Sequence, residues 1–325
     1  MGESARAAPR IPRAAAHIDE RGDMAGILLP NDDYLTEDEL AFFGAMGGYD
    51  LNAADGQERE DGPVATAASF EDELPPDPET RELAGRLVST LIEEGATAFN
   101  DFYLDNRAQI LDACRFSYTL SRLLVIGLKM GVSERNAFCA NTLGTLYYTG
   151  DVVEQDYAAA AKLYERAMEW GCYQSIINLG YIYEYGRTGQ PDHEKAFRYY
   201  ALAAAVAPSP EALYKFGDMY SRGKAVERNL VLARVLWQRS YDVADDIEDV
   251  AQPAIRLARL YEEPDCEEAG LQPDPLKALS LYQQAEIGLR ISVAKGAHYY
   301  ERRLREAVEG QLRVRELLDA DEPDV

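Results

Sequence analysis

A short pattern of glycine and aromatic residues recurs about every three dozen residues along the middle of the chain. The copies are LGTLYYTG from Leu143, LGYIYEYG from Leu179, FGDMYSRG from Phe216 and LARLYEEP from Leu257. The successive offsets are 36, 37 and 41 residues, and in the last copy Ala258 and Pro264 replace the two glycines. Because internal repetition at such a period is the signature of repeat architectures, it limits the fold more than any other feature.

A second group of positions repeats downstream of each copy, at the spacing of one helix face. An alanine is followed four residues later by an aromatic residue, and Asp or Asn, which cap helix N-termini well, precedes that alanine by four. Each unit is therefore predicted to be a hairpin of two helices. The positions that we expect to hold this scaffold are Gly144, Tyr147, Gly150, Tyr164, Gly180, Tyr183, Gly186, Tyr200, Gly217, Tyr220, Gly223 and Trp237.

The glycine in the middle of each first helix costs about 1 kcal/mol of helix stability relative to alanine. We therefore expect a compensating close approach of the backbone of the partner helix. The tyrosine three residues later lies on the same helix face and is expected to fill the gap between hairpins. Gly150, Gly186 and Gly223 are expected to end their helices in the left-handed conformation. Since no single hairpin can bury its apolar faces, neighbouring hairpins must stack.

The combined motif, Leu-Gly-xx-Tyr-xx-Gly followed by a short loop, Asp and Ala-xxx-Tyr-xx-Ala, resembles the Sel-1-like repeat, a branch of the tetratricopeptide-repeat superfamily. The resemblance is closest over residues 132–241, weaker to residue 289 and faint over 96–131. It implies an all-α fold, a right-handed α-solenoid of stacked helical hairpins. It also implies binding of proteins or peptides on the inner face of the solenoid, which the first helix of each unit lines.

The repeats divide the chain into predicted segments. Residues 76–319 are expected to form the solenoid, with units at about 96–131, 132–171, 172–207, 208–245 and 250–289 and a long capping helix at 290–319. In the first unit FNDFYLDN matches FGDMYSRG, with Asn106 in place of the left-handed glycine and a second helix running to about Met130. Residues 320–325 are predicted to be an acidic tail.

The beginning of the chain differs in composition from the rest. Residues 1–80 carry 5 basic and 19 acidic side chains, a net charge of −14 out of −24 for all 325 residues. With little periodic apolar content, residues 1–75 are predicted to be a largely disordered acidic tail. Thr36 and Glu39 have the spacing of a capping box, so a short helix is expected at 36–46. It is expected either to dock on the fold or to act as a linear motif that binds a partner or covers the groove of the fold.

Charge and cysteine content exclude several classes of protein. The net charge of −24 argues against binding of nucleic acid or anionic membranes. The most apolar run, LLVIGL at 123–128, is too short for membrane insertion. We therefore expect cytoplasmic localisation. Four cysteines without metal-site spacing are expected to be unpaired, mostly buried thiols in a reducing compartment: Cys114, Cys139, Cys172 and Cys266.

The sequence contains no recognisable catalytic motif. His17, His193 and His298 have no ligand partner at zinc-site spacing. The nucleophile elbow, the P-loop and the dinucleotide fingerprint are absent. The acidic run from Glu262 to Glu268 lacks the spacing of an EF-hand. We therefore predict no catalytic residues, no metal and no cofactor.

The predicted binding face comes from positions −3, +1 and +4 relative to each mid-helix glycine, which point away from the packed leucines and tyrosines. Its mixture of aromatic, amide and charged side chains suits a polar peptide, although a merely solvated face is the alternative. The residues are Asn141, Thr145, Tyr148, Ile177, Tyr181, Glu184, Tyr214, Asp218 and Arg259. The leading hypothesis is a non-enzymatic adaptor that binds a protein or peptide. Two alternatives stay open: an autoinhibited regulator whose N-terminal tail covers the groove, and a hydrolase-like enzyme built on the repeats.

Overall fold

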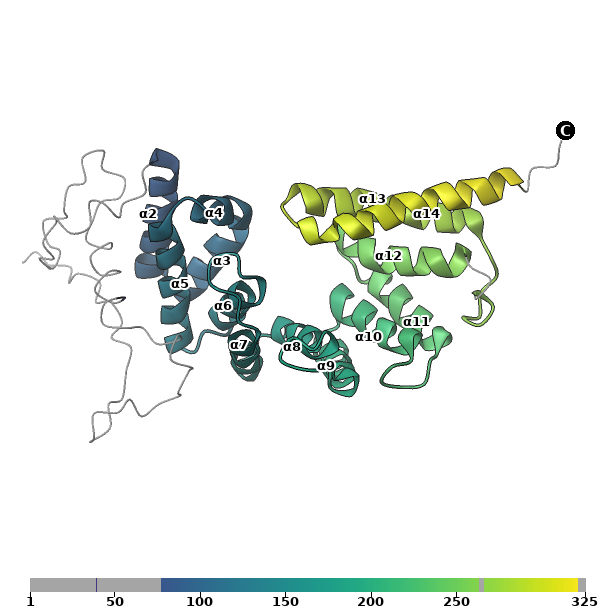
Figure 1. Cartoon of the computed structure of the whole chain (residues 1–325), viewed down its shortest axis with the longest axis horizontal. Helices are drawn as coiled ribbons and strands as arrows, with labels where there is room; N and C mark the ends of the chain where they lie inside the picture. Colours follow the sequence, from purple (N-terminus) through teal and green to yellow (C-terminus); the bar gives the residue numbers. More distant parts are fainter. Residues whose placement is uncertain (1–38, 40–76, 263–265, 321–325) are drawn as a thin grey trace, which may run out of the picture. The chain divides into compact units, whose positions relative to one another are not determined.

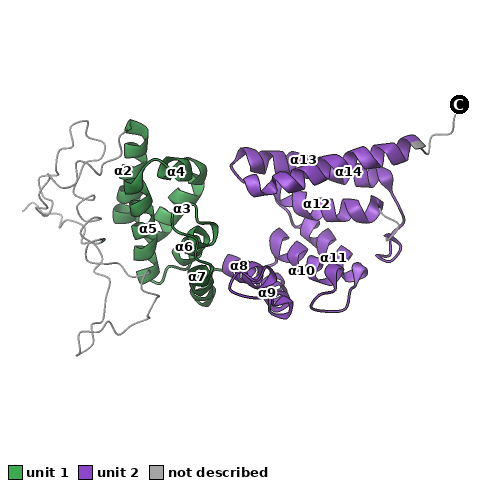
Figure 2. Ribbon diagram, viewed as in Figure 1, with its two compact units in different colours: residues 1–172 green, residues 173–325 purple. Residues whose placement is uncertain are grey.

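A computed structural model of the chain describes residue 39, residues 77–262 and residues 266–320. Within these residues all regular structure is helical and no strand occurs, which confirms the predicted all-α class. The tail predicted over 1–75 lies outside the described residues, apart from Glu39 in the expected 36–46 helix. Of the tail predicted at 320–325, only residue 320 is among them. The chain divides into two compact units, Met1–Cys172 and Tyr173–Val325 (Figure 2). This division is coarser than the repeat units, whose boundaries stay a prediction.

The first unit is built from short helices that pack on one another (Figure 1). In chain order they include α2 (Pro78–Glu94), α3 (Ala96–Asp105), α4 (Arg107–Cys114), α5 (Tyr118–Ser133), α6 (Ala137–Thr149) and α7 (Tyr157–Glu169). Asp77 caps α2, and its carboxylate accepts a hydrogen bond from the Thr80 amide at 2.8 Å. The pair α6 and α7 forms a hairpin, while α2, α3 and α6 all contact α5.

The turn after α3 differs from the prediction. Asn106 has φ −112°, not the expected left-handed value, and its side-chain amide donates to the Phe102 carbonyl at 2.8 Å. The amide thereby satisfies a helix-end carbonyl that a left-handed turn would otherwise have satisfied. The single second helix expected up to Met130 is also wrong. It is split into α4 and α5, because the Ser117 hydroxyl accepts from the Leu120 amide at 3.1 Å and starts a new helix.

The second unit is a series of hairpins. Its helices are α8 (Gln174–Glu184), α9 (His193–Val206), α10 (Pro210–Arg222), α11 (Leu230–Asp242), α12 (Ile247–Glu262), α13 (Pro275–Ala294) and α14 (Glu301–Ala320), with a 3-10 turn at His298–Tyr300. Within this unit α8 pairs with α9, α10 with α11 and α12 with α13. Because α10 also contacts α9 and α12, and α14 packs on α13, the hairpins are stacked in chain order.

The predicted helix ends are confirmed at most positions. Gly150, Gly186 and Gly223 have φ of 75°, 61° and 63°, in the left-handed region. The side chains of Asp156, Asp192, Asn229 and Asp274 each accept hydrogen bonds from backbone amides of the second helix. The C-terminal end differs, because Ile291 onward is not one helix. Gly296, with φ of 95°, cannot continue a right-handed helix, so α13 ends before it and α14 begins after it.

The glycine in the middle of each first helix makes room for an aromatic ring. A Cβ atom at these glycines would lie less than 3.0 Å from a buried ring on the second helix of the same hairpin. The pairs are Gly144 with Tyr164, Gly180 with Tyr200, and Gly217 with Trp237. The expected close approach is therefore confirmed in position. The nearest partner at these three positions is an aromatic side chain, and backbone of the partner helix also approaches at Gly217, where the Ala233 carbonyl oxygen would lie 3.1 Å from the added Cβ. A ring that covers a glycine keeps full contact with the helix surface, which offsets the lost helix propensity.

All four cysteines are buried and unpaired, as predicted. Burial raises the pKa of the Cys139 thiol to about 12 and that of Cys114 to about 11. Both thiols are therefore protonated at neutral pH, and in the folded chain they are poor nucleophiles.

We expect the substitution Gly180→Ala to lower the free energy of unfolding by about 1–3 kcal/mol, the usual cost of overpacking. The new methyl group collides with the buried ring of Tyr200, which cannot move without disturbing its own contacts. This cost exceeds the gain of about 1 kcal/mol in helix propensity. Urea denaturation of the purified chain measures the difference.

The matched control is Gly189→Ala, since a Cβ atom at Gly189 would meet nothing within 4 Å. Its free energy of unfolding should stay within about 0.5 kcal/mol of the wild-type value. Equal effects of the two substitutions would contradict the proposed fit of ring and glycine.

Candidate functional site

The aromatic residues of the second helices connect the packed core to the predicted binding face. Each ring carries a polar atom that donates to a side chain of the first helix, one or four residues after the glycine position. These bonds are Tyr164 to Thr145 at 3.3 Å, Tyr200 to Glu184 at 2.8 Å, Trp237 to Asp218 at 3.0 Å and Tyr282 to Glu262 at 2.6 Å. The same side chains therefore pack against the first helices and orient the polar groups on them.

In the first unit, the predicted residues Asn141, Thr145 and Tyr148 lie at intervals of four and three on α6, which places them on one helix face. All three are half-buried, so each keeps some exposed surface. The Thr145 hydroxyl donates to the Asn141 carbonyl at 3.0 Å, and the Tyr148 ring packs edge-on against Tyr157 with centroids 5.2 Å apart. The patch on α6 therefore offers an amide, a hydroxyl and an aromatic ring in a held geometry.

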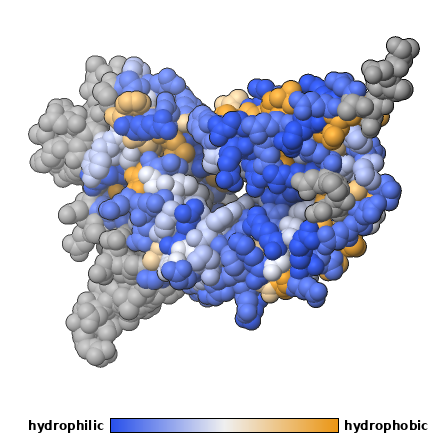
Figure 3. Space-filling view, turned by 45° about the vertical axis from the view of Figure 1, so that its right-hand side comes forward, coloured by the Kyte–Doolittle hydropathy of each residue, from blue (hydrophilic) through white to orange (hydrophobic). Residues whose placement is uncertain are grey.

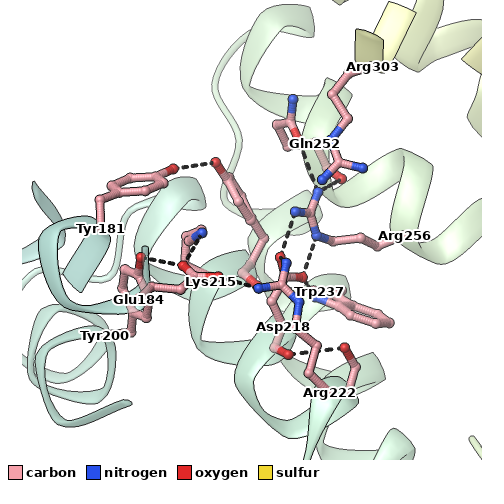
Figure 4. A network of polar contacts seen from close by, with 12 residues as sticks. Tyr181, Glu184, Tyr200, Lys215, Asp218, Arg222, Trp237, Gln252, Arg256 and Arg303 are labelled. Atoms are coloured by element: carbon pink, nitrogen blue, oxygen red, sulfur yellow. Dashed lines mark hydrogen bonds and ion pairs between the residues drawn. The ribbon is translucent and has the colours of Figure 1, made fainter. Parts of the chain in front are cut away.

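In the second unit, four predicted residues are brought together: Tyr181 and Glu184 from α8, and Tyr214 and Asp218 from α10. Figure 4 labels Tyr181, Glu184 and Asp218 among them. Of these, Glu184, Tyr214 and Asp218 are buried, and Tyr181 is half-buried. Ile177 is also buried, but its aliphatic side chain offers no polar group, while Arg259 on α12 is exposed and pairs with Glu306 of α14. The predicted face thus includes a buried polar network, which we call the α8–α10–α12 network.

One end of this network centres on Glu184. Its carboxylate accepts from the Tyr200 hydroxyl at 2.8 Å and from the Lys215 ammonium at 2.6 Å, and it also pairs with Arg222. Lys215 is buried as well, and its ammonium lies 4.3 Å from the centroid of the Tyr181 ring, a cation–π distance. Glu184 therefore links α8 to α9 and to two side chains of α10.

The other end centres on Asp218. Its carboxylate binds the guanidinium of Arg256 on α12 through two nitrogens, with Nη2 to Oδ2 at 2.7 Å, and it accepts from Trp237 Nε1 at 3.0 Å. Arg222 bridges the two ends, because it contacts Glu184 and also lies 3.3 Å from Asp218. Bidentate pairs between arginine and a carboxylate are among the strongest polar contacts in proteins. The network thus ties three successive first helices together.

The electrostatics of the two carboxylates follow from this geometry. Burial alone would raise their pKa values, but the charges and hydrogen bonds of Lys215 and Arg222 hold the pKa of Glu184 below its ordinary value. Against the same burial, Arg256 lowers the pKa of Asp218. Both groups are therefore ionised and weakly basic at neutral pH. In this state neither is suited to act as a general base or acid.

A third part of the network consists of tyrosine hydroxyls. Tyr181 donates to Glu211 at 2.8 Å, and its oxygen lies 3.3 Å from that of Tyr214. Burial and the nearby Glu211 carboxylate raise the pKa values of both phenols well above 10. These tyrosines therefore act as neutral hydrogen-bonding groups at every physiological pH.

Sequence reasoning missed the cations of this network: Lys215, Arg222 and Arg256. A signal was available for the two arginines, because Arg222 lies four residues after Asp218 and Arg256 four residues after Gln252, the spacing at which helix side chains meet. Arg256 also stands inside the apolar run AIRLARL, where an unpaired charge would be costly. What the sequence does not show is which carboxylate on another helix each cation meets.

Two further properties concern the described residues only. None of their helices combines the length and the apolar character that crossing a bilayer requires. Among them, no group of three or more His, Cys, Asp and Glu side chains is placed to hold a metal ion.

We expect Asp218→Asn to lower the free energy of unfolding at pH 7 by about 3–5 kcal/mol, because it leaves the buried Arg256 guanidinium without its counter-charge. The matched control is Asp112→Asn, which removes the carboxylate of an exposed pair with Arg115 and should cost less than about 1 kcal/mol. Urea denaturation monitored by circular dichroism compares the two.

The network also sets a pH dependence. The ordinary pKa values of Glu and Asp are 4.5 and 3.8, and folding lowers them for Glu184 and Asp218. The stability that these groups provide is therefore complete above about pH 4.5 and is lost as the pH falls through their folded-state values. In Asp218→Asn the loss of stability below pH 4.5 should be shallower than in the wild type. Parallel pH profiles would contradict this assignment.

Comparison with known proteins agrees with the hairpin assignment. Four segments match the model of the Sel1 repeat: residues 137–169, 174–205, 210–243 and 254–286. They coincide with the hairpins α6–α7, α8–α9 and α10–α11, and with most of α12–α13.

Two kinds of relatives show similarity. A putative ERAD-associated E3 ubiquitin-protein ligase component of Schizosaccharomyces pombe is 30% identical over 131 residues, which are 40% of this chain and 18% of that protein. This chain therefore spans less than a fifth of that relative. Among solved structures, a Sel1 repeat protein from Oxalobacter formigenes is 18% identical with a TM-score of 0.45, covering 66% of this chain and 89% of that one. A protective antigen of uropathogenic Escherichia coli with an SLR fold is 19% identical with a TM-score of 0.44, covering 73% of this chain and 54% of that one.

Each of the first three matched segments covers one hairpin and contains its glycine–aromatic pair, so the repeating unit is the hairpin. Four segments within residues 137–286 are therefore Sel1 repeats, and over them the chain is similar to proteins of the Sel1-like repeat family.

Proposed function

We propose that this chain is a non-enzymatic adaptor that binds a protein or peptide through the first helices of its repeats. Sel1 repeats generally mediate contacts between proteins. The fission yeast relative is named as a component of a ubiquitin-protein ligase. Because four segments of this chain are Sel1 repeats, a role in contacting other proteins is the function that its repeat region supports.

The observation that carries the proposal is the patch on α6. Asn141, Thr145 and Tyr148 share one face of a helix that is packed on both α5 and α7, and each keeps exposed surface. A tyrosine held by its neighbours contributes large contact area with little loss of conformational freedom, and such residues are enriched at binding hot spots. An amide and a hydroxyl beside it supply hydrogen bonds to a peptide backbone.

The second unit contributes less exposed surface to this role. Of its predicted residues, Tyr181 and Arg259 keep surface that a partner can contact, while Ile177, Glu184, Tyr214 and Asp218 are buried. The proposal therefore assigns binding to the exposed residues and assigns a scaffolding role to the buried ones. Such a network holds the first helices rigid, and rigidity lowers the entropic cost of binding.

The surface character agrees with a polar partner. The face seen in Figure 3 is mainly hydrophilic over the described residues, with hydrophobic residues in separate patches. A partner that binds such a surface is expected to make hydrogen bonds and aromatic contacts, not to bury one continuous apolar helix face.

The proposal is tested by affinity capture with the full chain, followed by a binding titration between the purified chain and each recovered protein. We expect Tyr148→Ala to weaken the binding of at least one such partner tenfold or more, since a hot-spot tyrosine is worth about 2 kcal/mol or more. Tyr118→Ala is the matched control, because Tyr118 is 76% exposed and belongs to α5, which is not one of the helices of the matched Sel1 repeats. Equal affinities of the wild type and Tyr148→Ala for every partner would refute the assignment of α6.

A second candidate, the autoinhibited regulator, is favoured by one contact. The carboxylate of Glu39 lies 2.9 Å from the buried Lys129 ammonium of α5, next to the repeat that contains α6. If the segment around Glu39 limits partner binding, Glu39→Gln should raise the affinity for an α6-binding partner at least threefold. The neighbouring Glu37→Gln serves as the control. An unchanged affinity in Glu39→Gln excludes this form of regulation.

A further inference from the structure

A second polar feature of the second unit is a pocket of about 260 Å³ between α10, α11, α12 and α14. It is lined by five arginines, Arg222, Arg228, Arg256, Arg259 and Arg303, together with Asp218, Ser221 and the apolar side chains of Leu230, Trp237 and Leu260. In a chain with a net charge of −24, such a concentration of guanidinium groups is not expected from composition. Figure 4 shows that Arg222, Arg256 and Arg303 come from three different helices.

The internal carboxylates do not neutralise these cations. Arg228 is paired with Glu268, and Glu262, the next acid along α12 from Arg259, is paired with Arg313. The remaining cations are Lys215, Arg222, Arg256, Arg259 and Arg303, and the carboxylates in contact with them are Glu184, Asp218 and Glu306. Five positive charges against three negative charges leave a surplus of two among these described side chains.

The surplus lies at the accessible side of the pocket. Arg256 and Lys215 are buried and are paired with Asp218 and Glu184, whereas the side chains of Arg222, Arg259 and Arg303 are 37%, 45% and 24% exposed. Each guanidinium carries five N–H donors, and the contacts with Glu184, Asp218 and Glu306 use only some of them. The guanidinium groups of Arg222, Arg259 and Arg303 therefore have N–H donors available for a group that enters the pocket.

The geometry and charge fit one ligand chemistry best. A phosphomonoester carries about −1.5 to −2 charges at neutral pH and three terminal oxygens that accept from several guanidinium groups at once. A carboxylate has one charge and would leave half of the surplus unbalanced. The volume is below the range of about 300–1,000 Å³ typical of pockets for drug-sized ligands, so it suits a single phosphoryl group on a short stem. Leu230, Trp237 and Leu260 form the apolar part of the lining, beside which such a stem can lie.

We propose that this arginine pocket binds a phosphomonoester group, either free or carried by a phosphorylated side chain of a protein. The site goes beyond the adaptor role proposed above and does not depend on it, because phosphate binding can be measured with no protein partner present.

The test is isothermal titration calorimetry of the full chain with three probes: inorganic phosphate, a short alanine peptide with one central phosphoserine, and the same peptide with glutamate in its place. We expect inorganic phosphate to bind, and the glutamate peptide to bind at least tenfold more weakly than the phosphoserine peptide. Tighter binding of the phosphoserine peptide than of inorganic phosphate supports a protein-borne group. Binding of inorganic phosphate alone supports a free phosphate ester and overturns the protein-borne source.

The variant that tests the pocket is Arg303→Gln, which removes one partly exposed guanidinium that makes a short-range pair on its own helix. We expect at least a tenfold loss of phosphate affinity. The matched control is Arg290→Gln, because Arg290 also pairs with a glutamate on its own helix, is 62% exposed and does not line the pocket. Thermal unfolding of both variants shows whether they are folded. Absence of phosphate binding by the wild type, or equal phosphate affinities of the two variants, would overturn the proposed phosphate site. If phosphate binding is retained but no protein partner binds, only the adaptor role is contradicted.

Discussion

In the hairpins α6–α7, α8–α9 and α10–α11, an aromatic ring of the second helix lies where a Cβ atom of the first helix would otherwise be. The contact depends on a residue without a side chain on one helix and on a flat, rigid side chain on the other. It therefore sets how closely and in what register the two helices pack. A smaller residue in place of the ring would leave a cavity, and a larger one in place of the glycine would force the helices apart.

The same rings also determine where the polar groups lie. Because each ring carries a hydroxyl or an indole N–H, its tip reaches an acceptor on the first helix, such as Glu184 or Asp218. Once those carboxylates are held in the interior, they require cations, and Lys215, Arg222 and Arg256 supply them. Buried ion pairs of this kind add little net stability compared with apolar packing, but an incorrect pairing is costly. We therefore interpret the α8–α10–α12 network as a device that specifies the relative placement of the three helices.

Equivalent repeat positions have different environments in different hairpins, and the repeat sequence alone does not show this difference. On α6 the equivalent positions are occupied by Asn141, Thr145 and Tyr148, which are uncharged and keep exposed surface. On α8 and α10 they are occupied by Tyr181, Glu184, Tyr214 and Asp218, which are linked to one another through polar contacts. Arg222 and Arg256, which contact Asp218, also line the arginine pocket. Positions that are equivalent in the repeat thus carry uncharged side chains with exposed surface in one hairpin and form a charged interior in others.

The sequence by itself determined the hairpins, their caps and the places of the glycine–aromatic pairs, because period, capping residues and left-handed glycines are properties of local segments of chain. Gly150, Gly186 and Gly223 could be assigned correctly for this reason, whereas Asn106 could not, since a side-chain hydrogen bond provided a second way to end α3. Only the tertiary structure decided which predicted face residues are exposed and which are buried. Whether Arg256 lies in solvent or against Asp218 depends on how α12 stacks on α10, and that stacking brings together residues 38 positions apart, which no local pattern encodes.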